Sequence, residues 1–290
     1  MRRPLLLLAL VFAISACSPQ SEARVPQANS SSSVSTAKKA ASSSSMKSPG
    51  LKRFAPAKKP AAFQPVIPKD LRIPVLVYHH VRPTKGYAKT TWSWKMSVSP
   101  AIFDKQMQWL TDHGYTTVDL TTLAGILQGT APSPAKPVVI TFDDNQLSQY
   151  ELAMPTLQKH GQIAVFYMIA GRLDSKGLLT REMIKDMAAK GMDIESHTMT
   201  HPVLTAVDAP RLEWELKESR RILEELIGKP VLHVAYPGTA HNQKVRDAAK
   251  AAGYVTASVM DPRRATEKDD LFKLPRIMMT DDTDLAKTLP

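Results

Sequence analysis

The sequence predicts one α/β domain, built as an open parallel sheet or a closed barrel, after a long polar N-terminal segment. Three observations predict it. Short apolar runs without polar alternation, typical of parallel strands covered on both faces, recur from Ile73 onward. Amphipathic segments separate these runs, so strand and helix succeed each other along the chain. Roughly seven such strands favour the barrel.

The first half of the domain shows this alternation clearly. Ile73 to Tyr78 is an apolar run that predicts a buried strand. A helix is expected over 101–113, because Phe103, Met107 and Leu110 fall on one face. The same patterns predict, in order, a helix over 120–127, a strand over 137–142, a helix over 151–160 and a strand over 163–169.

Capping residues mark the helices of the second half. Asp208 and Pro210 predict the start of a long helix over 211–227, and Gly228 its end. Thr180 starts a helix that closes near Gly191. The remaining expected elements are strands over 193–196, 231–236 and 254–259 and a helix over 242–252. In either architecture the functional site is expected at the C-terminal ends of the strands.

The N-terminus has the features of a secretion signal. Two arginines precede the apolar run 5–14, which is too short to span a membrane, and small residues follow it. Residues 1–16 are therefore predicted to be a signal peptide. Cys17, the only cysteine, follows these small residues, and the sequence Ile14-Ser15-Ala16-Cys17 resembles the lipobox of bacterial lipoproteins. An ordinary signal peptide with a chance cysteine is the alternative.

Residues 17–70 are predicted to be a disordered tether, because they are rich in Ser, Ala, Pro and Lys and poor in large apolar residues. Residues 1–72 carry twelve basic and two acidic residues, a net charge of +10, whereas the remainder carries +1. The folded part thus has no nucleic-acid footprint. The basic tether either touches anionic lipid or wall polymer, or is only a solvated linker.

Two motifs carry the chemistry. Asp143 and Asp144 follow the apolar strand at 137–142, although an Asp-Asp-Asn turn explains them equally well. His197 and His201 stand four residues apart, and on a helical turn both rings face one ion. With Asp144 as third ligand they predict a metal site. Two histidines and one carboxylate leave coordination positions open, as catalytic sites do.

These motifs together resemble a known family. T-F-D-D-N at 141–145, H-T-M-T-H-P at 197–202 and A-Y-P-G at 235–238 are similar to motifs of the polysaccharide deacetylases, the NodB-homology domain of carbohydrate esterase family four. The resemblance covers residues 73–280. It implies that residues 71–290 form a single catalytic domain, a distorted (β/α) barrel that removes acetyl groups from glycans. It implies Asp143 as general base, Asp144, His197 and His201 as metal ligands, and the Gly238 N–H as oxyanion donor.

The sequence departs from the family pattern at three places. Asn145 replaces a usual glycine, and Ala235 stands where many members have an arginine that orients the base. The stretch 274–279 lacks the family's acid histidine. The candidates for the general acid or for substrate binding are then His79, His80 and His241. Tyr236 is a candidate for lining the pocket. Trp92 and Trp94 are either a platform for sugar stacking or a cover for the core.

The sequence therefore predicts a lipoprotein that hydrolyses N-acetyl groups of an amino-sugar polymer. Its Cys17 anchor is expected in the outer membrane, facing the periplasm, and its metal is expected to be Zn²⁺, with Co²⁺ or Ni²⁺ as alternatives. An O-acetyl esterase and a catalytically weakened glycan-binding lipoprotein are the other hypotheses. Neither the polymer nor the oligomeric state follows from the sequence.

Overall fold

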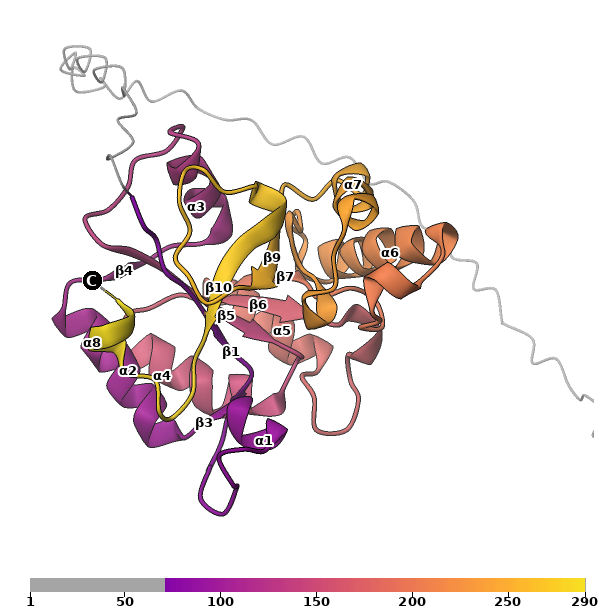
Figure 1. Cartoon of the computed structure of the whole chain (residues 1–290). Helices are drawn as coiled ribbons and strands as arrows, with labels where there is room; N and C mark the ends of the chain where they lie inside the picture. The colour runs from indigo at the N-terminus through magenta and orange to yellow at the C-terminus, as the bar shows by residue number, and fades with distance from the viewer. Residues whose placement is uncertain (1–70, 290) are drawn as a thin grey trace, which may run out of the picture. The chain divides into compact units, whose positions relative to one another are not determined.

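A computed structural model of the chain describes residues 71–289 (Figure 1). The predicted signal peptide, Cys17 and tether lie outside these residues and stay predictions. Within the described part, no helix is both long and apolar enough to cross a membrane.

Seven parallel strands of the described chain close into a barrel, which confirms the predicted fold and decides against the open sheet. Because β1 pairs with both β10 and β5, the ring has no free edge. The short β4 (Thr116–Thr117) extends the sheet beyond β5. In ring order the seven strands are β1 (Val75–Tyr78), β10 (Leu274–Met278), β9 (Thr256–Met260), β8 (His233–Ala235), β7 (Asp193–Ser196), β6 (Val165–Met168) and β5 (Pro137–Asp143).

Helices surround the barrel, as Figure 1 shows. Their ends follow the predicted caps: Asp208 accepts a hydrogen bond from the N–H of Arg211, and Gly228 ends α6 in the left-handed conformation. The expected helix over 151–160 starts earlier, as a π-helical turn over Gln149–Ala153. The larger helices are α2 (Pro100–Asp112), α3 (Leu120–Leu127), α4 (Met154–Lys159), α5 (Arg181–Ala189), α6 (Ala209–Ile227) and α7 (Gln243–Ala251).

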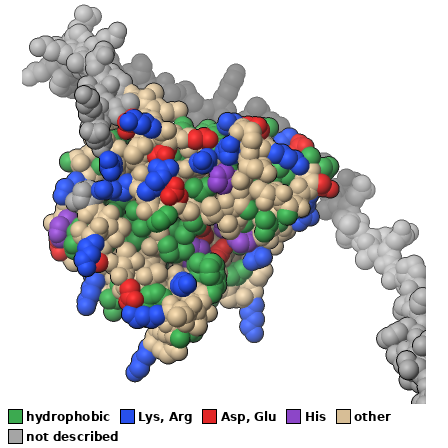
Figure 2. All heavy atoms as spheres, viewed as in Figure 1, with side chains coloured by type: hydrophobic (Ala, Val, Ile, Leu, Met, Phe, Trp, Pro, Cys, Tyr) green, Lys and Arg blue, Asp and Glu red, His purple; other side chains and the backbone are tan. Residues whose placement is uncertain are grey.

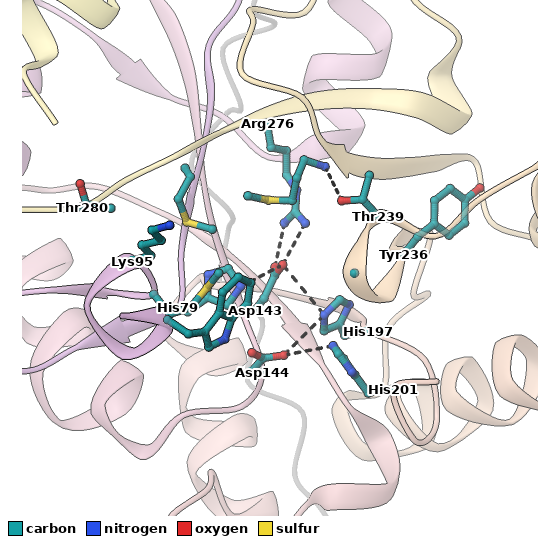
Figure 3. A pocket seen from close by; sticks show the side chains of 15 residues that line it. His79, Lys95, Asp143, Asp144, His197, His201, Tyr236, Thr239, Arg276 and Thr280 are labelled. Atoms are coloured by element: carbon teal, nitrogen blue, oxygen red, sulfur yellow. Dashed lines mark hydrogen bonds and ion pairs between the residues drawn. The ribbon is translucent and has the colours of Figure 1, made fainter. Parts of the chain in front are cut away.

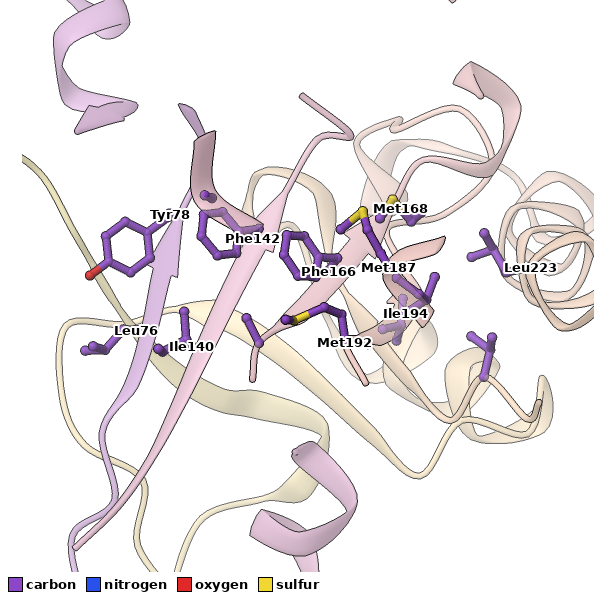
Figure 4. Close-up of a cluster of buried hydrophobic side chains, with 14 of the residues drawn as sticks. Leu76, Tyr78, Ile140, Phe142, Phe166, Met168, Met187, Met192, Ile194 and Leu223 are labelled. Carbon is purple, nitrogen blue, oxygen red and sulfur yellow. The ribbon is translucent and has the colours of Figure 1, made fainter. Parts of the chain in front are cut away.

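Two apolar cores hold the domain together. The outer core lies between the strands and the helices, and contains a row of stacked rings from Tyr78, Phe142 and Phe166 (Figure 4). The inner core fills the barrel at the strand starts, where Val75 and Val165 pack with leucines of α3. Since α3 closes this basal end, the open mouth lies at the carboxyl ends of the strands.

The strand β10 was not predicted. Its sequence, Leu274-Pro275-Arg276-Ile277-Met278, contains a proline and a charge and so lacks the apolar pattern of the other strands. Arg276 is nevertheless 1% exposed. A buried arginine needs a partner, and the partner lies in the site at the mouth.

Candidate metal and catalytic site

The mouth of the barrel holds a pocket of about 630 Å³. In Figure 2 hydrophobic side chains gather around a hollow in which acidic and histidine side chains are visible. The four residues predicted from the two motifs all line it: Asp143, Asp144, His197 and His201 (Figure 3). Its apolar wall includes Met96, Met260 and Met278 from three different segments.

The end of β5 separates the two carboxylates. Asp143 is the last strand residue and is 3% exposed, whereas Asp144 turns away with a φ of 78°. Asn145 follows with a φ of 56°, as expected for a residue that replaces glycine. Its side chain accepts from the N–H of Ile169 at 2.7 Å and donates to the carbonyl of the same residue at 3.0 Å. These bonds fix the turn that presents Asp144.

The loop from His197 to His201 corrects one expectation. The two rings do converge, but on an irregular loop in which Thr198 and His201 have positive φ, and not on a helical turn. The buried carboxylate of Glu215 on α6 holds the loop by accepting from the N–H groups of Met199 (2.9 Å) and Thr200 (2.8 Å). Glu215 was not predicted from the sequence, where its signal was an acid on the apolar face of α6.

The three predicted ligands fit a metal ion. The Nε2 atoms of His197 and His201 lie 3.5 and 3.6 Å from Asp144 Oδ1, and all three lie within 4.8 Å of one another. Ligands about 2.0–2.2 Å from a tetrahedral Zn²⁺ are roughly 3.4 Å apart, so little movement is needed.

The electronic state of His197 also fits a ligand. Its Nδ1 lies 2.8 Å from the carbonyl of Ala235, so Nδ1 donates there and Nε2 keeps its lone pair. Burial holds the pKa of His197 below its ordinary value, although Asp143 and Asp144 act in the opposite direction. The ring is therefore neutral, as metal binding requires.

Asp143 is paired with the buried Arg276. The guanidinium donates from its two terminal nitrogens to the two carboxylate oxygens, at 2.7 and 2.8 Å (Figure 3). Burial alone would raise the pKa of Asp143, but the positive charge of Arg276 and its hydrogen bonds outweigh this effect and hold that pKa well below its ordinary value. The arginine that the sequence lacks at Ala235 is thus supplied from β10, a strand that was not predicted.

The remaining predicted residues divide into two groups. His79, Trp92, Tyr236 and Gly238 line the pocket, whereas His80, Trp94 and His241 do not. Trp94 packs on Lys89, and His241 stacks on Tyr236, with ring centroids 5.7 Å apart. Trp92 is 73% exposed at the start of the short helix α1 (Trp92–Lys95), so it does not cover the core.

Comparisons with known proteins agree with this geometry. The sequence profile of the family described as polysaccharide deacetylase matches residues 130–257. A polysaccharide deacetylase from Bacillus cereus is 31% identical, with a TM-score of 0.67 over 75% of this chain and 69% of that chain. The deacetylase PplD of Streptococcus pyogenes, solved with acetate, is 26% identical, with a TM-score of 0.72 over 76% of this chain and 99% of that one.

A curated relative adds a named substrate. The poly-β-1,6-N-acetyl-D-glucosamine N-deacetylase of Staphylococcus aureus is 24% identical over 201 residues, which are 64% of this chain and 69% of that protein. The shared motifs, the closed barrel and the identity to the Bacillus cereus protein point to one conclusion. The chain belongs to the polysaccharide deacetylase family, whose members are hydrolases.

Proposed function

We propose that this protein hydrolyses N-acetyl groups on an amino-sugar polysaccharide and that it needs a divalent metal for the reaction. One observation carries the proposal: the ligand triangle of Asp144, His197 and His201 lies beside a buried carboxylate, Asp143, that has its own cationic partner. A module that only binds glycan has no use for such a carboxylate next to a metal site.

Each residue has a distinct task in this reaction. Asp144, His197 and His201 hold the metal, which supplies Lewis acidity for the acetyl carbonyl and for water. Asp143 accepts the proton of the attacking water, as a positioned general base. The N–H of Gly238, at the pocket wall, is the proposed donor to the developing oxyanion.

The pairing with Arg276 favours orientation of the base over its basicity. A lowered pKa reduces the proton affinity of Asp143, yet it keeps the carboxylate ionised and fixes both of its oxygens. Burial alone would otherwise shift this carboxylate toward its neutral form. Arg276 is therefore the positioning residue for the base.

The substrate class rests on two supports. The name of the Staphylococcus aureus relative identifies it as an N-deacetylase of a β-1,6-linked amino-sugar polymer. Trp92 offers an exposed aromatic face at the rim of the pocket, suited to stacking against a sugar ring. Both favour a polymeric N-acetylated sugar over a small amide.

The test measures acetate and new free amine from N-acetylated oligosaccharides, with the residue 71–290 domain supplied with Zn²⁺, Co²⁺ or Ni²⁺. Equal amounts of acetate and amine, dependent on metal, are expected. Acetate without amine would establish the O-acetyl esterase. No acetate from any substrate would support the glycan-binding alternative.

The metal ligands are tested separately. His197→Ala and His201→Ala should each lose the bound metal, whereas His113→Ala, which removes an exposed histidine at the end of α2, should keep it. Metal analysis after gel filtration measures the difference. Full metal content in either ligand variant would refute the assignment.

We further propose that the protein is a lipoprotein, anchored through Cys17 in the outer membrane and facing the periplasm. The lipobox-like sequence and the basic tether support this location. Cys17→Ser should release the protein from the membrane fraction without changing its activity. Unchanged membrane association of that variant would contradict the anchor.

A further inference from the structure

A second groove, of about 610 Å³, shares no lining residue with the pocket at the mouth. Its walls come from the segment before β1, the loop after β9, the strand β10 and the short helix α8 (Leu285–Thr288). Among its lining residues in the described chain none is acidic and four are basic: Arg72, Arg263, Arg264 and Lys287. Since residues 73–290 carry a net charge of only +1, the groove is a local concentration of positive charge.

The pairing of the chain places two of these arginines at the base of the barrel. Ile73 and Ala265 exchange two main-chain hydrogen bonds, each of 2.8 Å, as an antiparallel bridge. Both side chains are fully buried in the inner core at the strand starts. Because successive side chains of an extended segment point to opposite faces, Arg72 and Arg264 are directed outward, into the groove.

Most of the positive charge in the groove is available to a partner. Arg263 is compensated by two carboxylates, at 2.8 and 2.7 Å. Arg72 and Arg264, in contrast, form no ion pair within residues 71–289. The side chain of Lys287 is 86% exposed and lies 3.4 Å from one carboxylate, a contact that water screens. Three of the four basic groups can therefore bind an anion.

The place of the groove along the chain indicates the source of that anion. Arg72 directly follows the basic N-terminal segment, and residues 1–72 carry a net charge of +10. A lipid on Cys17 would hold this end of the domain near a bilayer, and such a linkage makes even a weak contact effective. Phospholipid headgroups carry phosphate, which the planar guanidinium of arginine binds with two donors. A soluble phosphate polymer has the same chemistry but lacks the linkage.

We propose that the groove lined by Arg72, Arg264 and Lys287 binds the headgroups of anionic phospholipids. The base of the barrel then rests on the membrane, and the mouth, at the opposite end, faces away from it toward the glycan. This contact goes beyond the proposed deacetylation and needs neither metal nor substrate. The proposed anchor at Cys17 serves only to bring the groove close to the lipid.

The experiment measures binding of residues 17–290, with Cys17→Ser, to vesicles of phosphatidylcholine alone or mixed with phosphatidylglycerol. Binding is expected only to the mixed vesicles and should be lost at high salt. Arg72→Gln combined with Arg264→Gln should weaken it about 25-fold, because each basic side chain near an anionic surface contributes about fivefold. The matched control, Lys105→Gln with Lys244→Gln, removes the same charge at exposed sites on α2 and α7 and should weaken it less than about threefold.

Hydrogen exchange locates the contact and separates it from binding by the N-terminal segment. Mixed vesicles should slow amide exchange in residues 262–266 and 285–289 at the groove, and should leave residues 92–96 at the mouth unchanged. Protection at the mouth, equal binding of the two double variants or equal binding to neutral vesicles would overturn the proposal. Binding to soluble polyphosphate without binding to vesicles would also overturn it, in favour of a phosphorylated polymer.

Activity on soluble oligosaccharides is measured in parallel and should be the same in the wild type and both double variants. A wild-type protein that releases no acetate but binds the mixed vesicles through the groove would refute the proposed function alone. An active protein whose vesicle binding ignores Arg72 and Arg264 would refute the lipid contact alone.

Discussion

Two clusters of acidic and histidine side chains lie at opposite ends of the same barrel, and they differ in how their polar atoms are satisfied. The basal cluster, defined as Thr121, Glu195, His233 and Thr256, lies near α3 and the strand starts. Both ring nitrogens of His233 contact threonine hydroxyls, at 2.8 and 3.0 Å. Glu195 accepts from the N–H groups of Leu232 and His233, where β7 and β8 share little of their ladder.

The mouth cluster, defined as Asp143, Asp144, His197 and His201, has the opposite character. The Nε2 atoms of its two histidines face Asp144 at 3.5 and 3.6 Å, longer than an ordinary hydrogen bond. Several residues that shape it have positive φ. Residue types alone therefore do not distinguish a structural cluster from a reactive one. A reactive cluster is distinguished by polar atoms that lack hydrogen-bond partners and that converge on a pocket.

The largest expected effect breaks the chemistry of the mouth and leaves its structure intact. Asp143→Asn should lower kcat about 10³-fold or more, because the base is lost, while metal content stays at the wild-type level. Steady-state kinetics with metal analysis of the same sample measures both. An Asp143→Asn variant with near-normal turnover would mean that the mouth cluster does not use this carboxylate as a base.

Arg276→Met tests the ion pair between Arg276 and Asp143 through the stability of the protein. It leaves a charged, buried Asp143 without its partner, so the free energy of unfolding at pH 7 should fall by about 3–5 kcal/mol. The double variant with Asp143→Asn should regain much of this loss, as chemical denaturation of all four proteins would show.

The pH dependence of this pair has a fixed sign. Arg276 lowers the pKa of Asp143 in the folded state, so the pair stabilises the wild type above the ordinary carboxyl pKa of about 3.9. This contribution is lost as pH falls below that value. The deficit of Arg276→Met should therefore shrink in acid, and a deficit constant from pH 7 to pH 3 would contradict the ion pair.

The residues of the mouth cluster were predictable from the sequence. The residues that were not predicted were missed for physical reasons. Asp143, Asp144, His197 and His201 lie next to apolar strands, so local pattern placed them together at the mouth. Arg276 could not be found in the same way. Its partner is 133 residues away, and its strand contains a proline and an inward charge that break the apolar pattern.

Glu215 was missed for the same reason, because only the folded chain brings α6 against the loop from His197 to His201. The bend of that loop was also beyond prediction. Spacing of four residues suggested a helical turn, whereas positive φ at Thr198 and His201 produces the convergence. Local periodicity predicts elements, but the closure of the barrel decides which distant side chains meet.

His233→Leu breaks the basal cluster and should leave the mouth unchanged. It leaves two threonine hydroxyls without their partner, so the free energy of unfolding should fall by about 2–3 kcal/mol at pH 7.5. Burial lowers the pKa of His233 to about 4, so acid favours the unfolded wild type between pH 6.5 and 4. The difference between the proteins should therefore narrow in that range.

Metal content and kcat of His233→Leu should equal those of the wild type once the folded fraction is taken into account. A loss of metal affinity in this variant would show that the two clusters are coupled through the barrel interior. The basal cluster could then no longer be described as purely structural and separate from the reactive cluster at the mouth.

The smallest expected effect concerns Asp193, the first residue of β7 at the basal end. Burial, reinforced by the charge of Asp119, raises its pKa to about 6. Below pH 6 the folded state binds a proton that the unfolded chain binds only near pH 4, so stability falls as pH rises through this window. Asp193→Asn removes that loss and should stabilise the protein by about 1 kcal/mol at pH 7.5, after allowance for the partial exposure of the side chain. It should give no gain at pH 4.

Asp112→Asn, at an exposed site on α2, should change stability at neither pH. An equal gain at both pH values would mean that the basal carboxylate acts through packing and not through its charge, whereas the expected pH-dependent gain would show that the basal end contains one charge that its surroundings do not satisfy.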